Sequence, residues 1–373
     1  MIMSIIAFIV VLSTLVLVHE LGHYWVAKRN GVLVEEFGIG YPPRVYGKKI
    51  GETLYSINAL PFGGFVRLHG ENLDESISDP KRAFLNKSKK TRATIIIAGV
   101  VMNFLLAIIA FAIVYSFSGV PVETTNVKVV EVVPESPAAE SGFLLEDVVR
   151  SVDGENVVTT TAFIEKIAQY KDEEVGVTVE RKEGDSTSKI QLTVIPRSEH
   201  PQDEGPLGVA ISTTEIYYPP LWQRPFIGIY YGFKEAIFWT KTIIMGLVMM
   251  VQRLFFGEIP KEIAGPIGIY ALTSQAEQFG ILTLINFVGI LSVNLVILNL
   301  LPFPALDGGR LFFIAIEAVI GRKIVPKVEY AFHVTGMIIL LSLIVIITIA
   351  DVRRLIINGG ISGFLESFLE SSN

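Results

Sequence analysis

The sequence predicts an α-helical polytopic membrane protein with four transmembrane helices and one folded extramembrane block. The chain has 373 residues, 51% of them hydrophobic, and a mean hydropathy of +0.52. A helix needs about 20 apolar residues to cross a bilayer. The chain contains four apolar runs long enough to do so, namely 1–27, 93–122, 278–306 and 330–350. An acidic, soluble-looking block lies between the second and third runs.

The first run carries the sequence HELGH, His19–His23. Two histidines four residues apart lie on one helical face, about one turn or ~6 Å apart along the axis, so both can bind one metal ion. In this pattern Glu20 is not a ligand but the general base that takes a proton from a zinc-bound water. The pattern also occurs by chance. Inside a membrane span, however, an ionisable group is costly and by default functional, so we predict a zinc hydrolase centre.

Residues 28–92 are predicted to be cytoplasmic. They contain twelve lysines and arginines, and basic residues mark cytoplasmic loops. The amino terminus is then outside. The first run lacks a basic n-region and a cleavage site, so it is not a signal peptide. The block 123–200 follows on the extracytoplasmic side.

Residues 201–277 are predicted to be a linker and an amphipathic interfacial helix. The apolar stretch 226–256 is broken by Lys234, Glu235, Lys241 and Arg253, which leaves an uncharged core too short to cross. If this stretch crossed once, Asp307 and His19 would lie on opposite sides of the membrane. We therefore expect it in the outer interface. A partly inserted hairpin is the alternative.

The third ligand is predicted to be Asp307, because a catalytic zinc usually has three protein ligands and one open position. Asp307 begins the cytoplasmic turn and loop 307–329, at the same depth as His19 and His23. Prolines and glycines around it predict irregular backbone, which membranes tolerate only where protein buries it or water reaches it. The alternative is a simple Asp-Gly turn that ends the helix. His69 would be the first replacement as a ligand. Residues 351–373 form a tail.

Charge and composition exclude a nucleic-acid-binding surface and any site that needs cysteine. The formal net charge is −6 and there is no cysteine. No basic excess is available to bind a nucleic acid, and neither disulfides nor thiolate ligands can form.

Three motifs in this order resemble the site-2 protease family of intramembrane zinc metalloproteases, in its RseP-type branch. They are HELGH, GVVMN (Gly99–Asn103) and NLLPFPALDGG (Asn299–Gly309). PFGGFV (Pro61–Val66) and AGPIGI (Ala264–Ile269) also match. The resemblance implies that His19, His23 and Asp307 bind Zn²⁺ and that Glu20 is the base. It also implies that Asn294 and Asn299 hold the substrate backbone, although hydrogen bonds between helices explain them equally well.

The resemblance further implies a membrane re-entrant β-hairpin or sheet within residues 34–66. A transmembrane substrate must unwind before hydrolysis, and its freed backbone groups then need partners. Strand addition along Gly63, Gly64, Phe65 and Val66 would supply them. A cytoplasmic hairpin without a substrate role is the alternative.

The acidic block resembles a single α+β PDZ domain, carried by the sequence from Ser136 to Val157. Such domains bind peptide termini by strand addition beside a carboxylate-capturing loop. We expect this loop near Gly142–Leu145. The domain either binds a peptide or excludes bulky ectodomains.

The expected function is hydrolysis of peptide bonds in or near the transmembrane segment of single-span membrane proteins. The resemblance implies regulated intramembrane proteolysis at a bacterial inner membrane, on substrates already shortened by another protease. An anti-sigma factor or a remnant signal peptide would fit. Two alternatives remain: an inactive membrane-anchored PDZ scaffold, and a metal transporter. The scaffold predicts that changing Glu20 is harmless, and the transporter would need a polar path across the bilayer.

Overall fold

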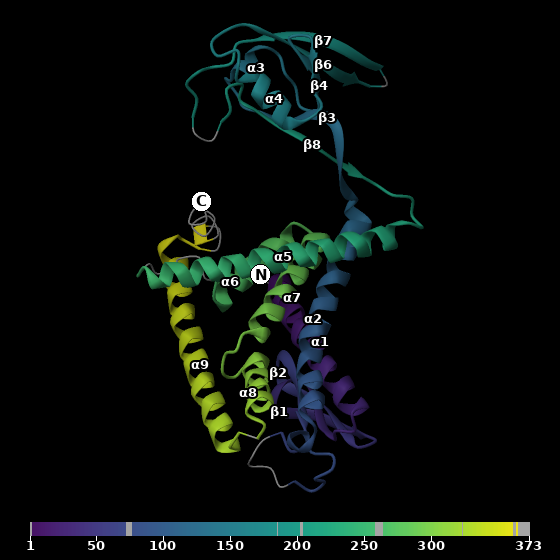
Figure 1. Cartoon of the computed structure of the whole chain (residues 1–373), viewed down its shortest axis with the longest axis vertical. Helices are drawn as coiled ribbons and strands as arrows, with labels where there is room; N and C mark the ends of the chain where they lie inside the picture. Colours follow the sequence, from purple (N-terminus) through teal and green to yellow (C-terminus); the bar gives the residue numbers. More distant parts are fainter. Residues whose placement is uncertain are drawn as a thin grey trace. The chain divides into compact units, whose positions relative to one another are not determined.

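The computed structural model describes residues 2–71, 77–184, 186–201, 204–257, 264–322, 324–360 and 363–364. The chain divides into two compact units. One unit comprises Met1–Ser118 and Pro220–Asn373, and the other comprises Gly119–Pro219. The first unit contains the long helices, and the second is built on an antiparallel sheet (Figure 1).

The first unit contains eight of the described helices and a β-region. Its elements, in chain order, are α1 (Ile2–Arg29), β1 (Val34–Ile50), β2 (Thr53–Leu68), the 3-10 helix η1 (Phe84–Asn86), α2 (Lys89–Ser118), α5 (Arg224–Phe255), α6 (Pro266–Gln278), α7 (Ile281–Leu300), α8 (Asp307–Ile320) and α9 (Pro326–Ile357).

Five helices in the described part of the chain are long and apolar enough to cross a membrane: α1, α2, α5, α7 and α9. Four of them cover the predicted spans. The fifth, α5, covers the segment expected in the interface. Figure 1 shows α5 running across the direction of α2 and α9, at the end of the bundle where α1 begins.

Helix α5 approaches α2 through two glycines one turn apart. A Cβ atom on Gly228 would lie 2.6 Å from the carbonyl oxygen of Ala112, and one on Gly232 would lie 2.6 Å from that of Ile108. Side chains larger than hydrogen are therefore excluded at this crossing. Small residues allow backbones to approach closely in membrane helix pairs.

Strands β1 and β2 form an antiparallel sheet in which each strand folds back on itself. Phe37 lies opposite both Val66 and Tyr55, and Tyr55 also lies opposite Lys48. The resulting order places 64–68 at one edge of the sheet, beside 34–39. This edge segment packs against α1. Several large apolar side chains of the sheet are exposed, among them Val45, Tyr46, Ile57, Leu60 and Phe62.

The AGPIGI motif lies at the start of α6. Helix α6 approaches α9 closely there, which explains why the motif contains glycines. The carboxylate of Asp351 on α9 accepts a hydrogen bond from the backbone N–H of Gly268, at 3.0 Å. A Cβ atom on Gly265 would lie 2.6 Å from the same carboxylate. Asp351 is fully buried. A carboxylate at a helix N-terminus satisfies free N–H groups and interacts favourably with the helix dipole.

Replacing Asp351 by Ala is expected to destabilise the helical unit by about 1–3 kcal/mol, because the buried N–H of Gly268 loses its acceptor. Asp351→Asn keeps an acceptor oxygen and should cost less. Thermal unfolding in detergent measures both. Equal losses for the two variants would contradict the capping role.

The second unit contains a six-stranded sheet and two short helices. Its strands are β3 (Val120–Val132), β4 (Val148–Val152), β5 (Glu155–Asn156), β6 (Val175–Glu183), β7 (Ser186–Val194) and β8 (Val209–Tyr217), and its helices are α3 (Pro137–Glu140) and α4 (Thr160–Ile167). The main strand order is β7-β6-β4-β3-β8, with β5 paired to β4. One apolar core, which includes Val127, Phe143, Val149, Phe163 and Val177, lies within it.

This unit extends beyond the predicted block 123–200. Strand β8, which the sequence analysis placed in the linker 201–277, pairs with β3 from Val120↔Tyr217 to Val132↔Val209. This pairing could not be predicted from the sequence, because β3 and β8 lie at opposite ends of the segment that forms the unit. The stretch after residue 200 therefore belongs to the folded unit up to Pro219.

Candidate metal centre

The two histidines of HELGH lie on the buried face of α1. His19 and His23 are both buried, and their Nε2 atoms are 3.0 Å apart. The Nδ1 atom of His23 lies 2.9 Å from the carbonyl oxygen of Ile95 on α2. A carbonyl only accepts hydrogen bonds, so this Nδ1 carries a proton. In the neutral ring the lone pair is then on Nε2, which faces His19.

Asp307 completes the cluster from a distant part of the chain. Its Oδ2 lies 3.1 Å from His19 Nε2 and 3.2 Å from His23 Nε2. The backbone between α7 and α8 turns sharply to bring it there. A Cβ atom on Gly308 would lie 2.0 Å from the carbonyl oxygen of Leu301. Only glycine fits this approach, which explains the Gly after Asp307.

The three ligand atoms fit a metal ion. They lie within 4.8 Å of one another. Zinc bonds of about 2.0–2.2 Å in a tetrahedron place neighbouring ligand atoms roughly 3.3–3.6 Å apart. Two imidazole nitrogens and a carboxylate oxygen are donors of the kind that zinc takes in its three-ligand sites.

Glu20 lies beside the cluster and is held by the sheet. Its Oε2 accepts a hydrogen bond from the backbone N–H of Val66, at 3.0 Å. A pocket of about 210 Å³ is lined by Glu20, the three cluster residues, Tyr41, Gly64, Phe65 and Val66, among others. A carboxylate fixed at this wall can exchange protons with a water bound at the cluster.

The predicted substrate residues divide into two groups. Gly64, Phe65 and Val66 line the pocket. Gly63 instead faces α1, where its Cβ position lies 3.2 Å from Val16. Asn294 and Asn299 are half-buried on α7 and are absent from the described lining of this pocket. Contact of these residues with a substrate remains a prediction.

Gly99 is a site residue to which the sequence analysis assigned no role. It begins the GVVMN motif on α2, and a Cβ atom there would lie 2.5 Å from Nε2 of His23 and 2.7 Å from Cε1 of His19. On α1, a Cβ atom on Gly22 would lie 2.3 Å from the carbonyl oxygen of Ala98. The two glycines let α1 and α2 touch at the cluster. Small residues at helix contacts in membranes are the signal that could have identified them.

His69 is not a ligand of the cluster. Its Nδ1 lies 2.6 Å from Oε1 of Glu35, and its Nε2 accepts the N–H of Asp79. Both ring nitrogens are therefore occupied elsewhere.

His333 supports the turn that carries Asp307. Its Nδ1 accepts the backbone N–H of Ala305 at 3.0 Å. Ala305 has a φ of 71°, which is unfavourable for a residue with a side chain. The hydrogen bond from α9 therefore stabilises a strained backbone two residues before Asp307.

Replacing His333 by Phe is expected to weaken zinc binding about 10–100-fold, the range typical of residues that orient a ligand. His333→Gln retains an acceptor and should recover part of the affinity. Competition with a chelator measures both. Unchanged zinc affinity in His333→Phe would show that the turn holds its position without α9.

Comparisons with known proteins point to one family. The family model described as Peptidase family M50 matches residues 7–343. The zinc metalloprotease RasP of Oceanobacillus iheyensis is 30% identical over 94% of this chain and 99% of its own length. The RasP of Geobacillus kaustophilus is 31% identical over 94% and 98%. The regulator of sigma-W protease RasP of Bacillus subtilis is 28% identical over 94% and 99%.

Solved structures also match a part of the chain, and one of them is a PDZ domain. It is the PDZ domain of an SdrC-like protein from Listeria monocytogenes, with 22% identity and a TM-score of 0.19. The match covers 24% of this chain and 90% of that one.

Proposed function

This chain belongs to peptidase family M50 and is an intramembrane zinc metalloprotease, and we propose that it cuts single-span membrane proteins in or near their transmembrane segment. The convergence of His19, His23 and Asp307 beside Glu20 carries this proposal. These ligands come from α1 and from the start of α8, so the centre exists only in the assembled helical unit.

The proposed chemistry is metal-assisted peptide hydrolysis. Bound zinc would lower the pKa of its water toward about 7 and polarise the scissile carbonyl. Glu20 accepts the proton of the attacking water and later donates it to the leaving amine. The N–H of Val66 orients this carboxylate. His23 is oriented by the carbonyl of Ile95, and Asp307 by its glycine-rich turn.

We propose that the substrate adds as a strand to the edge segment 64–68. This segment has a sheet neighbour on one side, 34–39, and the pocket on the other. An unwound substrate placed there would satisfy its backbone groups and lie beside Glu20. The exposed apolar residues of the sheet support a position dipping into the membrane.

We propose four spans, with the amino terminus outside and α5 in the outer interface. By length and composition α5 could cross. Its charged Lys234, Glu235 and Lys241, and its course across the other helices (Figure 1), favour the interface. The basic loop 28–92 places the metal centre toward the cytoplasm. A bacterial inner membrane fits this arrangement.

The second unit is proposed to be a PDZ domain on the extracytoplasmic side. Its peptide site is better placed at β8 than at the predicted loop Gly142–Leu145. Strand β8 is an edge strand of the sheet and packs near α4. Strand β4, which follows that loop, is an interior strand between β3 and β6. Strand addition needs an edge. The second proposal for this unit is that it excludes substrates with bulky ectodomains. Prior shortening of the substrate by another protease is compatible with both the peptide-binding role and the filter role.

The test uses the full-length protein, purified and reconstituted in liposomes with a panel of single-span substrates. We expect cleavage within or next to the membrane segment, loss of cleavage on chelation, and recovery with stoichiometric zinc. Cleavage that survives complete removal of zinc, or a zinc-loaded protein that cuts no member of a broad panel, would count against the proposal.

A further inference from the structure

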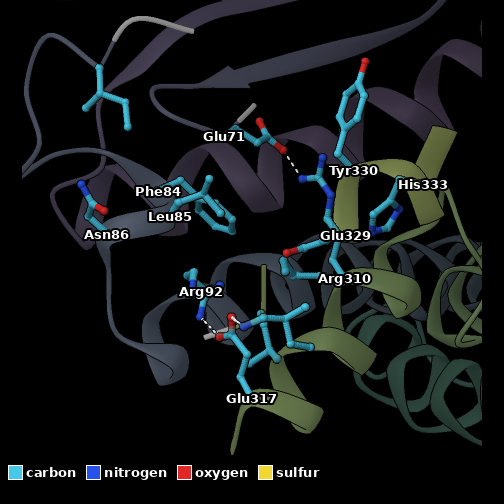
Figure 2. A pocket seen from close by; sticks show the side chains of 14 residues that line it. Glu71, Phe84, Leu85, Asn86, Arg92, Arg310, Glu317, Glu329, Tyr330 and His333 are labelled. Atoms are coloured by element: carbon cyan, nitrogen blue, oxygen red, sulfur yellow. Dashed lines mark hydrogen bonds and ion pairs between the residues drawn. The ribbon is translucent and has the colours of Figure 1, made fainter. Parts of the chain in front are cut away.

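A second cavity adjoins the active-site pocket at the end of the bundle where α2 begins. Its volume is about 300 Å³. It is lined by η1 and by parts of α2, α8 and α9 (Figure 2). Glu71, Phe84, Ile96 and Arg310 line both this cavity and the active-site pocket. The two spaces therefore share one wall.

Three carboxylates line this cavity, and two of them form ion pairs with arginines. Arg310 forms an ion pair with Glu71, and Arg92 forms a buried ion pair with Glu317. The third carboxylate, Glu329 on α9, has no hydrogen bond or ion pair within the part of the chain that the structure describes. Figure 2 shows Glu329 pointing toward the space between the two ion pairs.

The chemistry favours a cation as the occupant. Both arginines already have carboxylate partners, so an anion would have to displace one of them at the cost of leaving a buried charge unpaired. A Lys or Arg side chain would instead pair with the free carboxylate of Glu329. Phe84, Ile96 and Ile314 in the lining can cover the aliphatic stem of such a side chain.

The position of the cavity indicates where this side chain comes from. Single-span proteins carry Lys and Arg close to the cytoplasmic end of their span. A substrate that leaves the metal centre toward the cytoplasm would pass the shared wall within a few residues of the scissile bond.

We propose that this cavity is a specificity site for a basic side chain in the cytoplasmic flank of the substrate, with Glu329 as its counter-ion. The inference rests on the proposed function. Glu329 contributes to substrate choice and not to the chemistry of hydrolysis, so its effect should depend on the charge of the flank.

The test compares substrates in which one flanking position at a time is Lys, Gln or Glu. With the unmodified protein, we expect Lys at the correct position to give about tenfold higher kcat/KM than Gln, the size of effect seen for close charge pairs at interfaces. Glu329→Gln should remove most of this preference, so that the Lys and Gln substrates are cleaved with similar kcat/KM. Glu277→Gln is the matched control, since Glu277 is also half-buried but lies on α6 and does not line the cavity.

A binding measurement separates failure of this inference from failure of the proposed function. In the background of Glu20→Gln, fluorescence anisotropy with labelled flank peptides should show the same preference for Lys and its loss in Glu329→Gln. Cleavage without any flank preference, together with binding indifferent to charge, would overturn the inference and leave the protease intact. If no substrate were cleaved but the flank peptides still bound with a preference for Lys, the result would support the specificity site and count against the proposed substrates. A preference that Glu329→Gln leaves unchanged would assign it to another residue and overturn the role of Glu329.

Discussion

Replacing Glu20 by Gln is expected to lower the cleavage rate by roughly 10²–10⁴-fold while zinc stays bound, because only the proton acceptor is removed. The amide has nearly the shape of the carboxylate, and its oxygen can still accept the N–H of Val66. His19, His23 and Asp307 are unchanged. Zinc content and single-turnover cleavage, measured on the same preparation, give both results.

Asp307→Asn is the matched variant for this experiment. It removes the anionic ligand, which lies 3.1 and 3.2 Å from the two imidazole nitrogens, so zinc and cleavage should be lost together. Loss of activity with zinc retained in Glu20→Gln, and loss of both in Asp307→Asn, would separate base from ligand. If Glu20→Gln cleaved at the unmodified rate, the base would have to be another group and the scaffold hypothesis would regain weight.

Replacing Gly99 by Ala is expected to abolish tight zinc binding and cleavage, although a single methyl group is added. Its Cβ would lie 2.5 Å from Nε2 of His23, closer than non-bonded atoms approach. The ring of His23 is also hydrogen-bonded to Ile95, so it cannot move aside without losing that partner. We expect α1 and α2 to separate at the cluster, which displaces two ligands at once.

Gly246→Ala on α5 is the control for this change. Within the part of the chain that the structure describes, no heavy atom lies within 4 Å of its Cβ position, and Ala is favoured over Gly in a helix interior by up to about 1 kcal/mol. This variant should keep its zinc and activity and unfold at the same or a higher temperature. Normal zinc affinity in Gly99→Ala would mean that the helices tolerate a wider spacing than the structure indicates.

The sequence by itself predicted the chemistry of this protein. Histidines at a spacing of four on an apolar helix, with an acid between them, indicate a metal hydrolase because few other uses justify ionisable groups in a membrane. The expectation that Asp307 lies on the same side as His19 led to the prediction that the stretch 226–256 does not cross the membrane. Both inferences depend on local pattern and on solvation, which are properties of the chain that require no tertiary contacts.

Other features were decided only by the tertiary structure, because they depend on distances between segments far apart in the chain. The role of Gly99 requires knowing that α2 touches α1 at the histidines. The membership of β8 in the second unit depends on its pairing with β3, and the residues of one strand do not identify the strand with which it pairs. The support of Ala305 by His333, and the position of the Glu329 carboxylate beside two ion pairs, likewise follow from packing. Solvation energy can be inferred from residue types along the chain, whereas steric fit and charge pairing arise only when the helices assemble.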